Sequence, residues 1–272
     1  MIRGEDYSFL VEFMAKQCGM ELGLDKSYLI RSRLEPLVQK YNLKDLTALV
    51  DHLRADNHKE LREEVVDCML TKESLFFRDG PVYQSLQDSV LPALFEARKV
   101  MKAIRVWSAA CSTGQEPYSI AMMLSQYPKD LRDWHMNILA TDISRTALER
   151  SMAGVYSSFE VQRGISEVML KRFFIPQDAN WKVNPEVARK ITFGQQNLIQ
   201  PFQNKGPFDI IFCRYVLIYF DFETKKKILN EISKCLAPDG YLVLGASENV
   251  LGIDQFVKTE DIKVSIYRKK GN

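Results

Sequence analysis

The sequence predicts an α/β protein, in which a doubly wound sheet follows a small all-α domain. Residues 1 to about 75 show helical periodicity and contain no convincing strand. From about residue 102, apolar strand-like runs alternate with helical stretches, which is typical of a parallel sheet packed between helices. A chain of 272 residues can form one large domain or two of unequal size, and the change in pattern favours two.

The first part is predicted to be an all-helical domain over residues 1–70, followed by a linker over residues 71–101 that ends in a helix. Apolar residues recur at helical spacing in four stretches. The expected helices cover about residues 8–18, a stretch starting near Ser27, 44–53 and 59–70. In the second of them, Pro36 should kink the helix or open a new first turn, because proline disrupts a helix interior.

The second part, residues 102–272, is predicted to alternate strands and helices. The expected strands are AIRVWSAA (103–110), MNILATDIS (136–144), RKITFGQQNL (189–198), FDIIFCRYVLIYF (208–220) and APDGYLVLGAS (237–247), with a closing strand or hairpin in residues 256–270. Residues from about 156 to 190 break this alternation and are interpreted as an inserted β-subdomain. Within it, residues 166–174 look helical, and residues 180–193 look like a hairpin that leads into the third strand.

Composition argues against several function classes. The net charge is +2 and there is no basic-aromatic stripe, so nucleic acid is not an expected partner. The N-terminus resembles no signal peptide and no apolar run approaches ~18 residues, so we expect a cytoplasmic protein without direct membrane insertion. The five cysteines are scattered and the three histidines lack ligand spacing, which predicts reduced thiols and no metal site.

The stretch VWSAACSTGQEPYSIAM (106–122) predicts a ligand site, because a strand leads through small residues into a helix N-terminus. A dinucleotide or S-adenosylmethionine (SAM) would suit it. The loop has one glycine, Gly114, and no GxGxxG or Walker pattern. Glu116 favours a ligand with a cationic end, as SAM has, although it could simply complement the helix dipole. Asp142, ending the next strand, could accept hydrogen bonds from ribose hydroxyls in either ligand.

Six motifs occur one after another along the chain, and their order makes the combination specific. They are LTKESLFFRD (70–79), SAACSTGQEPYSIAM (108–122), ATDIS (140–144), NL (197–198), FDIIFCRYVLIYFD (208–221) and PDGYLVLGASEN (238–249). Together they closely resemble the CheR family of chemoreceptor protein-glutamate O-methyltransferases, over the whole chain. The resemblance implies a class I SAM-methyltransferase sheet with an inserted small β-subdomain. It also implies methyl transfer from SAM to the γ-carboxylate of receptor glutamates, leaving S-adenosyl-L-homocysteine, in chemotaxis adaptation.

The resemblance implies a set of site residues and no metal. The implied SAM-binding positions are Ser74, Arg78, Ala110, Glu116, Asp142, Asn197, Leu198, Cys213 and Arg214. Arg78 and Tyr219 are the implied catalytic residues, with Arg78 holding the incoming carboxylate and Tyr219 at the mouth of the site. Alternatively, Arg78 forms a structural ion pair with Asp79 or another acidic residue, and Tyr219 belongs to the core. The family pattern is broken at Lys72 and Tyr215, where asparagine is common, and at Ala246, where histidine is frequent.

The expected partners are the cytoplasmic domains of methyl-accepting chemoreceptors, and we expect the protein to be a monomer. Residues 1–70 carry ten Lys and Arg against thirteen Asp and Glu, yet residues 26–45 carry five basic residues against two acidic ones. A basic helix suits an acidic helical bundle, and the candidate docking residues are Arg31, Arg33 and Lys40.

The predicted β-subdomain contains the glycine-free stretch FFIPQDANWKVNPEV (173–187). Some family members carry a glycine-rich turn there and tether to a receptor's C-terminal pentapeptide through an added strand. We therefore expect this enzyme to act without that tether. The alternatives are a SAM-dependent methyltransferase of another protein or a small molecule, and a SAM-binding signalling module without turnover.

Overall fold

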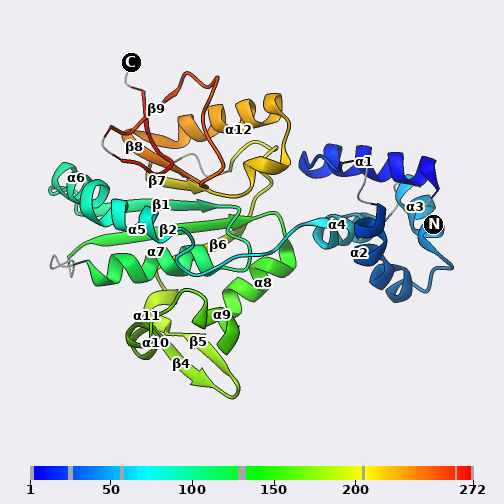
Figure 1. Cartoon of the computed structure of the whole chain (residues 1–272), viewed down its shortest axis with the longest axis horizontal. Coiled ribbons are helices and arrows are strands. Elements are labelled where there is room, and N and C mark those ends of the chain that lie inside the picture. Colours follow the sequence, from blue (N-terminus) through cyan, green and yellow to red (C-terminus); the bar gives the residue numbers. More distant parts are fainter. Residues whose placement is uncertain are drawn as a thin grey trace. The chain divides into compact units, whose positions relative to one another are not determined.

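The computed structural model describes residues 3–23, 27–55, 58–127, 133–203, 206–260 and 262–270 (Figure 1). The chain divides into two compact units, Met1–Thr71 with Tyr219–Thr224, and Lys72–Ile218 with Lys225–Asn272. Lys26 of the predicted basic helix and Asp261 of the predicted closing hairpin lie outside the described residues. Within the described ranges, no helix combines the length and the apolar character needed to cross a bilayer.

The N-terminal unit is all-helical, as the sequence predicts. Its helices are α1 (Gly4–Cys18), α2 (Ser27–Lys40), α3 (Leu46–Arg54) and α4 (Lys59–Met69). Their apolar faces form a core in which Met14, Ile30 and Leu49 are fully buried. Helix α2 runs through Pro36 without starting again, so the prediction of a new first turn there is wrong. Packing of the residues on both sides of Pro36, Leu34 and Leu37, keeps the helix together.

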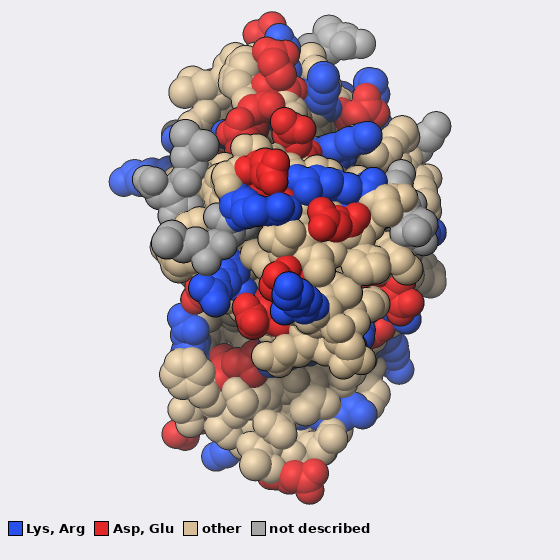
Figure 2. Space-filling view, turned by 90° about the vertical axis from the view of Figure 1, so that its right-hand side faces the viewer, with Lys and Arg blue, Asp and Glu red and all other residues tan. Residues whose placement is uncertain are grey.

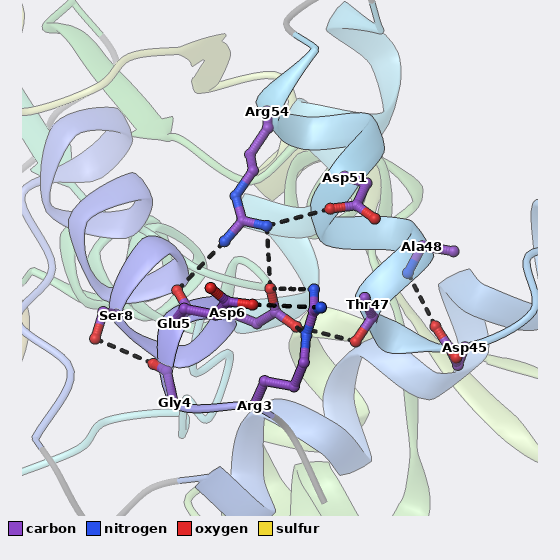
Figure 3. Close-up of polar contacts among 10 residues, drawn as sticks. All are labelled: Arg3, Gly4, Glu5, Asp6, Ser8, Asp45, Thr47, Ala48, Asp51 and Arg54. Atoms are coloured by element: carbon purple, nitrogen blue, oxygen red, sulfur yellow. Dashed lines mark hydrogen bonds and ion pairs between the residues drawn. The ribbon is translucent and has the colours of Figure 1, made fainter.

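A buried carboxylate joins α1 to α3 in this unit (Figure 3). Asp6 is fully buried and accepts hydrogen bonds from Arg3 Nε at 2.8 Å and Thr47 Oγ1 at 2.9 Å. Arg54 Nη1 lies 3.1 Å from the other carboxylate oxygen. The hydrogen bond from Arg3 lowers the pKa of Asp6, so the carboxylate stays charged in the folded unit.

The larger unit is built on a seven-stranded sheet of order β6-β2-β1-β7-β8-β10-β9. The strands are β1 (Ala103–Ala109), β2 (His135–Asp142), β6 (Ile191–Gln195), β7 (Phe208–Cys213), β8 (Leu236–Leu244), β9 (Phe256–Lys258) and β10 (Ile266–Lys269). The first five in spatial order pair in parallel, whereas β10 is antiparallel to both β8 and β9. Every residue of β7 is buried, which explains its unbroken apolar sequence. The predicted fold class is thus confirmed.

Helices connect these strands and pack on the sheet. They are α5 (Gly80–Ser85), the π-helix η1 (Leu86–Val90), α6 (Leu91–Ala97), α7 (Gln115–Gln126), α8 (Arg145–Ala153), the 3-10 turn η2 (Leu217–Tyr219) and α12 (Phe222–Cys235). Helices α7 and α8 both contact β2 and β6. Because α7 follows β1 and α8 follows β2, both helices start at the carboxyl edge of the sheet, where ligands of such folds bind.

The inserted segment forms a second sheet of order β3-β5-β4. Its elements are β3 (Val155–Ser157), α9 (Ser158–Gln162), α10 (Glu167–Phe173), β4 (Phe174–Gln177), β5 (Asn180–Val183) and α11 (Pro185–Ala188). The hairpin therefore joins β4 to β5, and the prediction of a hairpin over residues 180–193 is wrong. Asn184 starts a short helix instead, because its side chain accepts the N–H of Glu186 and Pro185 occupies the first turn.

Candidate active site

The candidate site lies where β1, β2 and β7 end. Ala109 of β1 lies beside Thr141 of β2 and beside Cys213 of β7. The residues that follow these strand ends, Ala110 and Arg214, therefore reach the same edge of the sheet as Asp142. Parallel pairing thus gathers side chains that are far apart in the sequence.

The loop after β1 is held in a fixed and unusual conformation. Ala110, Ser112 and Gly114 all have positive φ, at 59°, 51° and 94°, in the left-handed region that non-glycine residues rarely adopt. The carboxylate of Asp142 accepts the N–H of Ser112 at 2.8 Å and that of Ser144 at 2.8 Å. Asp142 therefore shapes the loop.

The inserted segment is hydrogen-bonded to this loop. The Tyr156 hydroxyl donates to the Thr113 carbonyl at 2.7 Å, and a Cβ added at Gly114 would lie 2.8 Å from that hydroxyl oxygen. The Tyr118 hydroxyl donates to the Ser151 carbonyl at 2.7 Å, and burial raises the pKa of Tyr118 to about 12. Both tyrosines therefore stay neutral and act as structural donors.

A buried ion-pair chain crosses the site. Glu116 accepts the Ser108 hydroxyl at 2.7 Å and Arg214 Nη1 at 3.1 Å, and Arg214 Nη2 donates to Asp79 at 2.7 Å. The Arg214 side chain is only 2% exposed. Burial raises the pKa of Glu116, while Arg214 acts against that shift. Burial alone would lower the pKa of Arg214, but the charges of Glu116 and Asp79, with Tyr83, outweigh it and raise that pKa. The Nε of Arg214 is buried and has no hydrogen-bond partner among the described residues.

Glu248 holds the loop that follows β7. Its carboxylate accepts backbone N–H groups from Tyr215 at 2.7 Å, Val216 at 3.0 Å, Leu217 at 2.8 Å and Gly245 at 2.8 Å. Sequence reasoning noted the motif around Glu248 without assigning it a role. Three of its four donors lie in the loop after β7, far from Glu248 in the sequence, so no local pattern assigns it this role.

The linker motif brings Arg78 into this unit's site. The Arg78 guanidinium carbon lies 3.4 Å from the centre of the Tyr215 ring. Asp79 is bound by Arg214 and by the Tyr215 hydroxyl, so the alternative of an Arg78–Asp79 ion pair is not what the structure shows. Upstream of Ser74, the Lys72 carbonyl accepts the Ser112 hydroxyl at 3.1 Å, which ties the linker to the loop after β1.

Other predicted site residues lie along the same sheet edge or outside this unit. Asn197 and Leu198 follow β6, and the neighbouring Gln196 N–H donates to the Asp142 carbonyl at 3.0 Å. Cys213 is fully buried, and burial raises the pKa of its thiol, so the thiol stays protonated and unreactive. Tyr219 groups with the N-terminal unit, where its carbonyl accepts the Glu21 N–H at 2.9 Å.

The three predicted docking residues lie on α2 and have partners within their own unit. Arg31 Nε lies 3.8 Å from Glu35, and Lys40 Nζ lies 2.6 Å from Glu64. Both side chains remain more than half exposed. Arg33 differs, because its guanidinium donates to the Met69 carbonyl at the end of α4. Arg33 therefore connects α2 to α4.

Comparison with known proteins assigns this architecture to a family. Two family models match the chain. The model described as "CheR methyltransferase, SAM binding domain" matches residues 72–266. The model described as "CheR methyltransferase, all-alpha domain" matches residues 5–70. The chain belongs to the CheR methyltransferase family. The predicted family and enzyme class are thereby confirmed, and SAM rather than a dinucleotide is the ligand to which the matched domain points.

Relatives of similar length support this assignment. The chain is 43% identical to a chemotaxis protein methyltransferase of Vibrio parahaemolyticus, over 99% of this chain and 98% of the relative. It is 40% identical to chemotaxis protein methyltransferase Cher2 of Pseudomonas putida, over 97% and 98%. It is also 40% identical to chemotaxis protein methyltransferase 1 of Vibrio cholerae, over 99% and 98%. This protein is thus a SAM-dependent methyltransferase of the chemotaxis family.

Proposed function

We propose that this protein methylates the γ-carboxylates of specific glutamates on the cytoplasmic helical bundle of chemoreceptors. The observation that carries the proposal is the match to chemotaxis protein methyltransferases over nearly the whole chain, with both CheR domains present. The product would be a glutamyl methyl ester. We further propose that the enzyme works in the cytoplasm as a monomer, with residues 1–70 as a docking domain, 71–101 as a linker and 102–272 as the catalytic domain.

The residues at the sheet edge fit SAM. The unpartnered Nε of Arg214 calls for an acceptor such as the carboxylate of an amino acid, and Glu116 offers a buried negative charge for an ammonium group. Asp142 is the proposed acceptor of hydrogen bonds from the ribose hydroxyls. The remaining proposed SAM-binding residues are Ser74, Arg78, Ala110, Asn197, Leu198 and Cys213. SAM, when bound, supplies a methyl group activated by a sulfonium charge.

The proposed reaction requires little acid–base catalysis from the protein. A glutamate carboxylate is already ionised at neutral pH, so no general base is required. Methyl transfer converts a negatively charged carboxylate and a positively charged sulfonium into a neutral ester and a neutral thioether. A site that excludes water favours this loss of charge. We propose that Arg78 orients the incoming carboxylate and that Tyr219 is the second catalytic residue, as the family resemblance implies. Both residues would act by aligning the reacting groups.

Docking is proposed to use the exposed cations of α2. The side chains of Arg31 and Lys40 are 65% and 57% exposed, whereas Arg33 supports them by holding α2 against α4. Figure 2 shows basic side chains interspersed with acidic ones on one face of the molecule, so recognition would rest on local charges. Arg31→Glu should raise the KM for the receptor about tenfold at low salt, since charge reversal there adds repulsion. Lys59→Glu, at a 91% exposed cation of α4, is the matched control.

Independence from a receptor pentapeptide is also proposed. The turn between β4 and β5 consists only of Asp178 and Ala179, which leaves no glycine-rich loop beside the edge strand β4. Titration of the enzyme with peptides that carry a receptor tail tests this point. No binding up to millimolar peptide is expected, and micromolar binding would contradict it.

The test of the main proposal uses tritiated SAM, the full-length enzyme and inner membranes that contain receptors from the same cell. Methyl esters are counted as methanol released by alkali, with Arg78→Ala as the control variant. Alkali-labile label on receptors that falls in the control supports carboxyl methylation. If calorimetry shows SAM binding but no receptor acquires alkali-labile label, the acceptor is another molecule or the protein only binds SAM.

A further inference from the structure

Tyr215 has an unfavourable backbone conformation. It stands in the motif FCRYVLIYF, directly after Arg214. Its φ is 58°, in the left-handed region that asparagine adopts readily and that an aromatic residue adopts rarely. A tyrosine therefore occupies this position against its own backbone preference.

The side chain of Tyr215 makes two contacts that asparagine could not make. Its ring lies under Arg78, with the guanidinium carbon 3.4 Å from the ring centre. Its hydroxyl donates to the Asp79 carboxylate oxygen that also accepts Arg214 Nη2. Glu248 fixes the Tyr215 backbone by accepting its N–H at 2.7 Å. The Tyr215 ring is therefore fixed at both ends, by the backbone hydrogen bond to Glu248 and by the hydroxyl hydrogen bond to Asp79.

These contacts keep Arg78 available. A guanidinium stacked on a ring is held through its face, so its in-plane N–H donors stay directed outward. Among the described residues, no acceptor binds the Arg78 guanidinium. Asp79 is its neighbour in sequence and the most direct competitor for its charge, but Tyr215 and Arg214 occupy the Asp79 carboxylate. The arrangement thus holds a cation in place without using its donors.

We propose that Tyr215 is a positioning residue for methyl transfer, which holds Arg78 and turns Asp79 away so that Arg78 can receive an acceptor carboxylate. This inference rests on the proposed function, because it assigns Arg78 to the acceptor. It predicts that Tyr215 acts through Arg78, so the loss of its side chain should affect SAM affinity no more than the loss of Arg78 does.

The experiment is a double-mutant cycle on the full-length enzyme with receptor membranes. Tyr215→Asn should lower kcat/KM for the receptor by about tenfold or more, while the Kd for SAM rises no more than it does in Arg78→Ala. Tyr215→Phe keeps the ring and loses the hydroxyl, so it should fall between wild type and Tyr215→Asn. In the Arg78→Ala background, Tyr215→Asn should cause no further loss. Phe159→Asn removes an exposed ring beneath Arg163 and should leave kcat/KM unchanged.

Two results would overturn the inference. One is wild-type kcat/KM in Tyr215→Asn, and the other is a loss in the double variant equal to the product of the two single losses. If the wild-type enzyme labels no receptor, the proposed function itself fails. The cycle is then measured by thermal unfolding, where coupling between Arg78 and Tyr215 supports the holding role, and strict additivity overturns it.

Discussion

Replacing Arg214 by methionine tests the energetics of the buried ion-pair chain. Methionine fills a similar volume but leaves Glu116 without its cationic partner and Asp79 with only the Tyr215 hydroxyl. Removing one member of a buried pair costs about 3–5 kcal/mol. The Glu116 side chain is 13% exposed and the Asp79 side chain is 29% exposed, so Glu116 dominates and water relieves part of the Asp79 cost. We expect a loss of about 3–4 kcal/mol in the free energy of unfolding at pH 7.5.

The loss should depend on pH in a defined direction. Burial already raises the pKa of Glu116, and loss of the opposing Arg214 charge raises it further. A carboxyl with a raised folded-state pKa is destabilising when charged, fully so above that pKa, and the cost disappears as pH falls toward its unfolded value. The difference between wild type and Arg214→Met should therefore shrink between pH 7.5 and 5. Adding Glu116→Gln should recover all but about 1–2 kcal/mol.

Urea unfolding without SAM, followed by tryptophan fluorescence, measures these differences. The three tryptophans, Trp107, Trp134 and Trp181, all lie in the larger unit, so the signal reports that unit alone. Arg145→Met is the matched control, because Arg145 is 77% exposed and its pair with Glu149 should be worth less than about 0.5 kcal/mol. A loss below about 1 kcal/mol for Arg214→Met, or a loss that grows at acid pH, would refute the reasoning.

Three further predictions concern other parts of the chain. Gly164→Ala should cost about 1–3 kcal/mol in urea unfolding, because the new Cβ would lie 2.0 Å from the Phe76 carbonyl oxygen; Gly80→Ala, which meets nothing within 4 Å, should be neutral. Glu248→Gln should weaken SAM binding in calorimetry at least about tenfold, since an amide cannot accept four N–H groups; wild-type affinity would contradict this. Asp6→Asn should destabilise the N-terminal unit by about 2 kcal/mol in circular dichroism at pH 7. Because the folded pKa of Asp6 is lowered, wild type loses this advantage only as pH falls below the ordinary aspartate value of about 4, and an unchanged difference at pH 2.5 would argue against it.

Much of the fold could be predicted because apolar patterning reports burial. The fully buried β7 reads as an apolar run, and Asp45 before α3 caps it by accepting the Ala48 N–H at 2.9 Å. The prediction of a hairpin over residues 180–193 is wrong. Local strand propensity around residues 180–193 does not reveal that Asn184 and Pro185 stop the strand and start a helix. The helix start formed by Asn184 and Pro185 therefore determines the structure there, in spite of the local strand propensity.

The candidate site was predictable only in part. Glu116, Asp142 and Arg214 follow strands or open a helix, so topology places them at one sheet edge. Asp79 and Glu248 act through partners distant in sequence, and no local pattern predicts those pairings. Tyr215 was visible only as a departure from the family. Its importance comes from what lies against its ring, which only the structure supplies.

The hydrogen bond from Tyr156 to the loop after β1 limits how the inserted segment can be deleted or exchanged by protein engineering. An insertion between a helix and the next strand is usually a dispensable module, open to deletion or exchange. Here Tyr156 and Glu160 reach the loop and the first turn of α7, through Thr113 and Gln115. A minimal methyltransferase made by excising residues 155–190 would lose the hydrogen bonds that support the loop after β1 and the start of α7. Chimaeras between relatives should therefore exchange the insertion and the loop together.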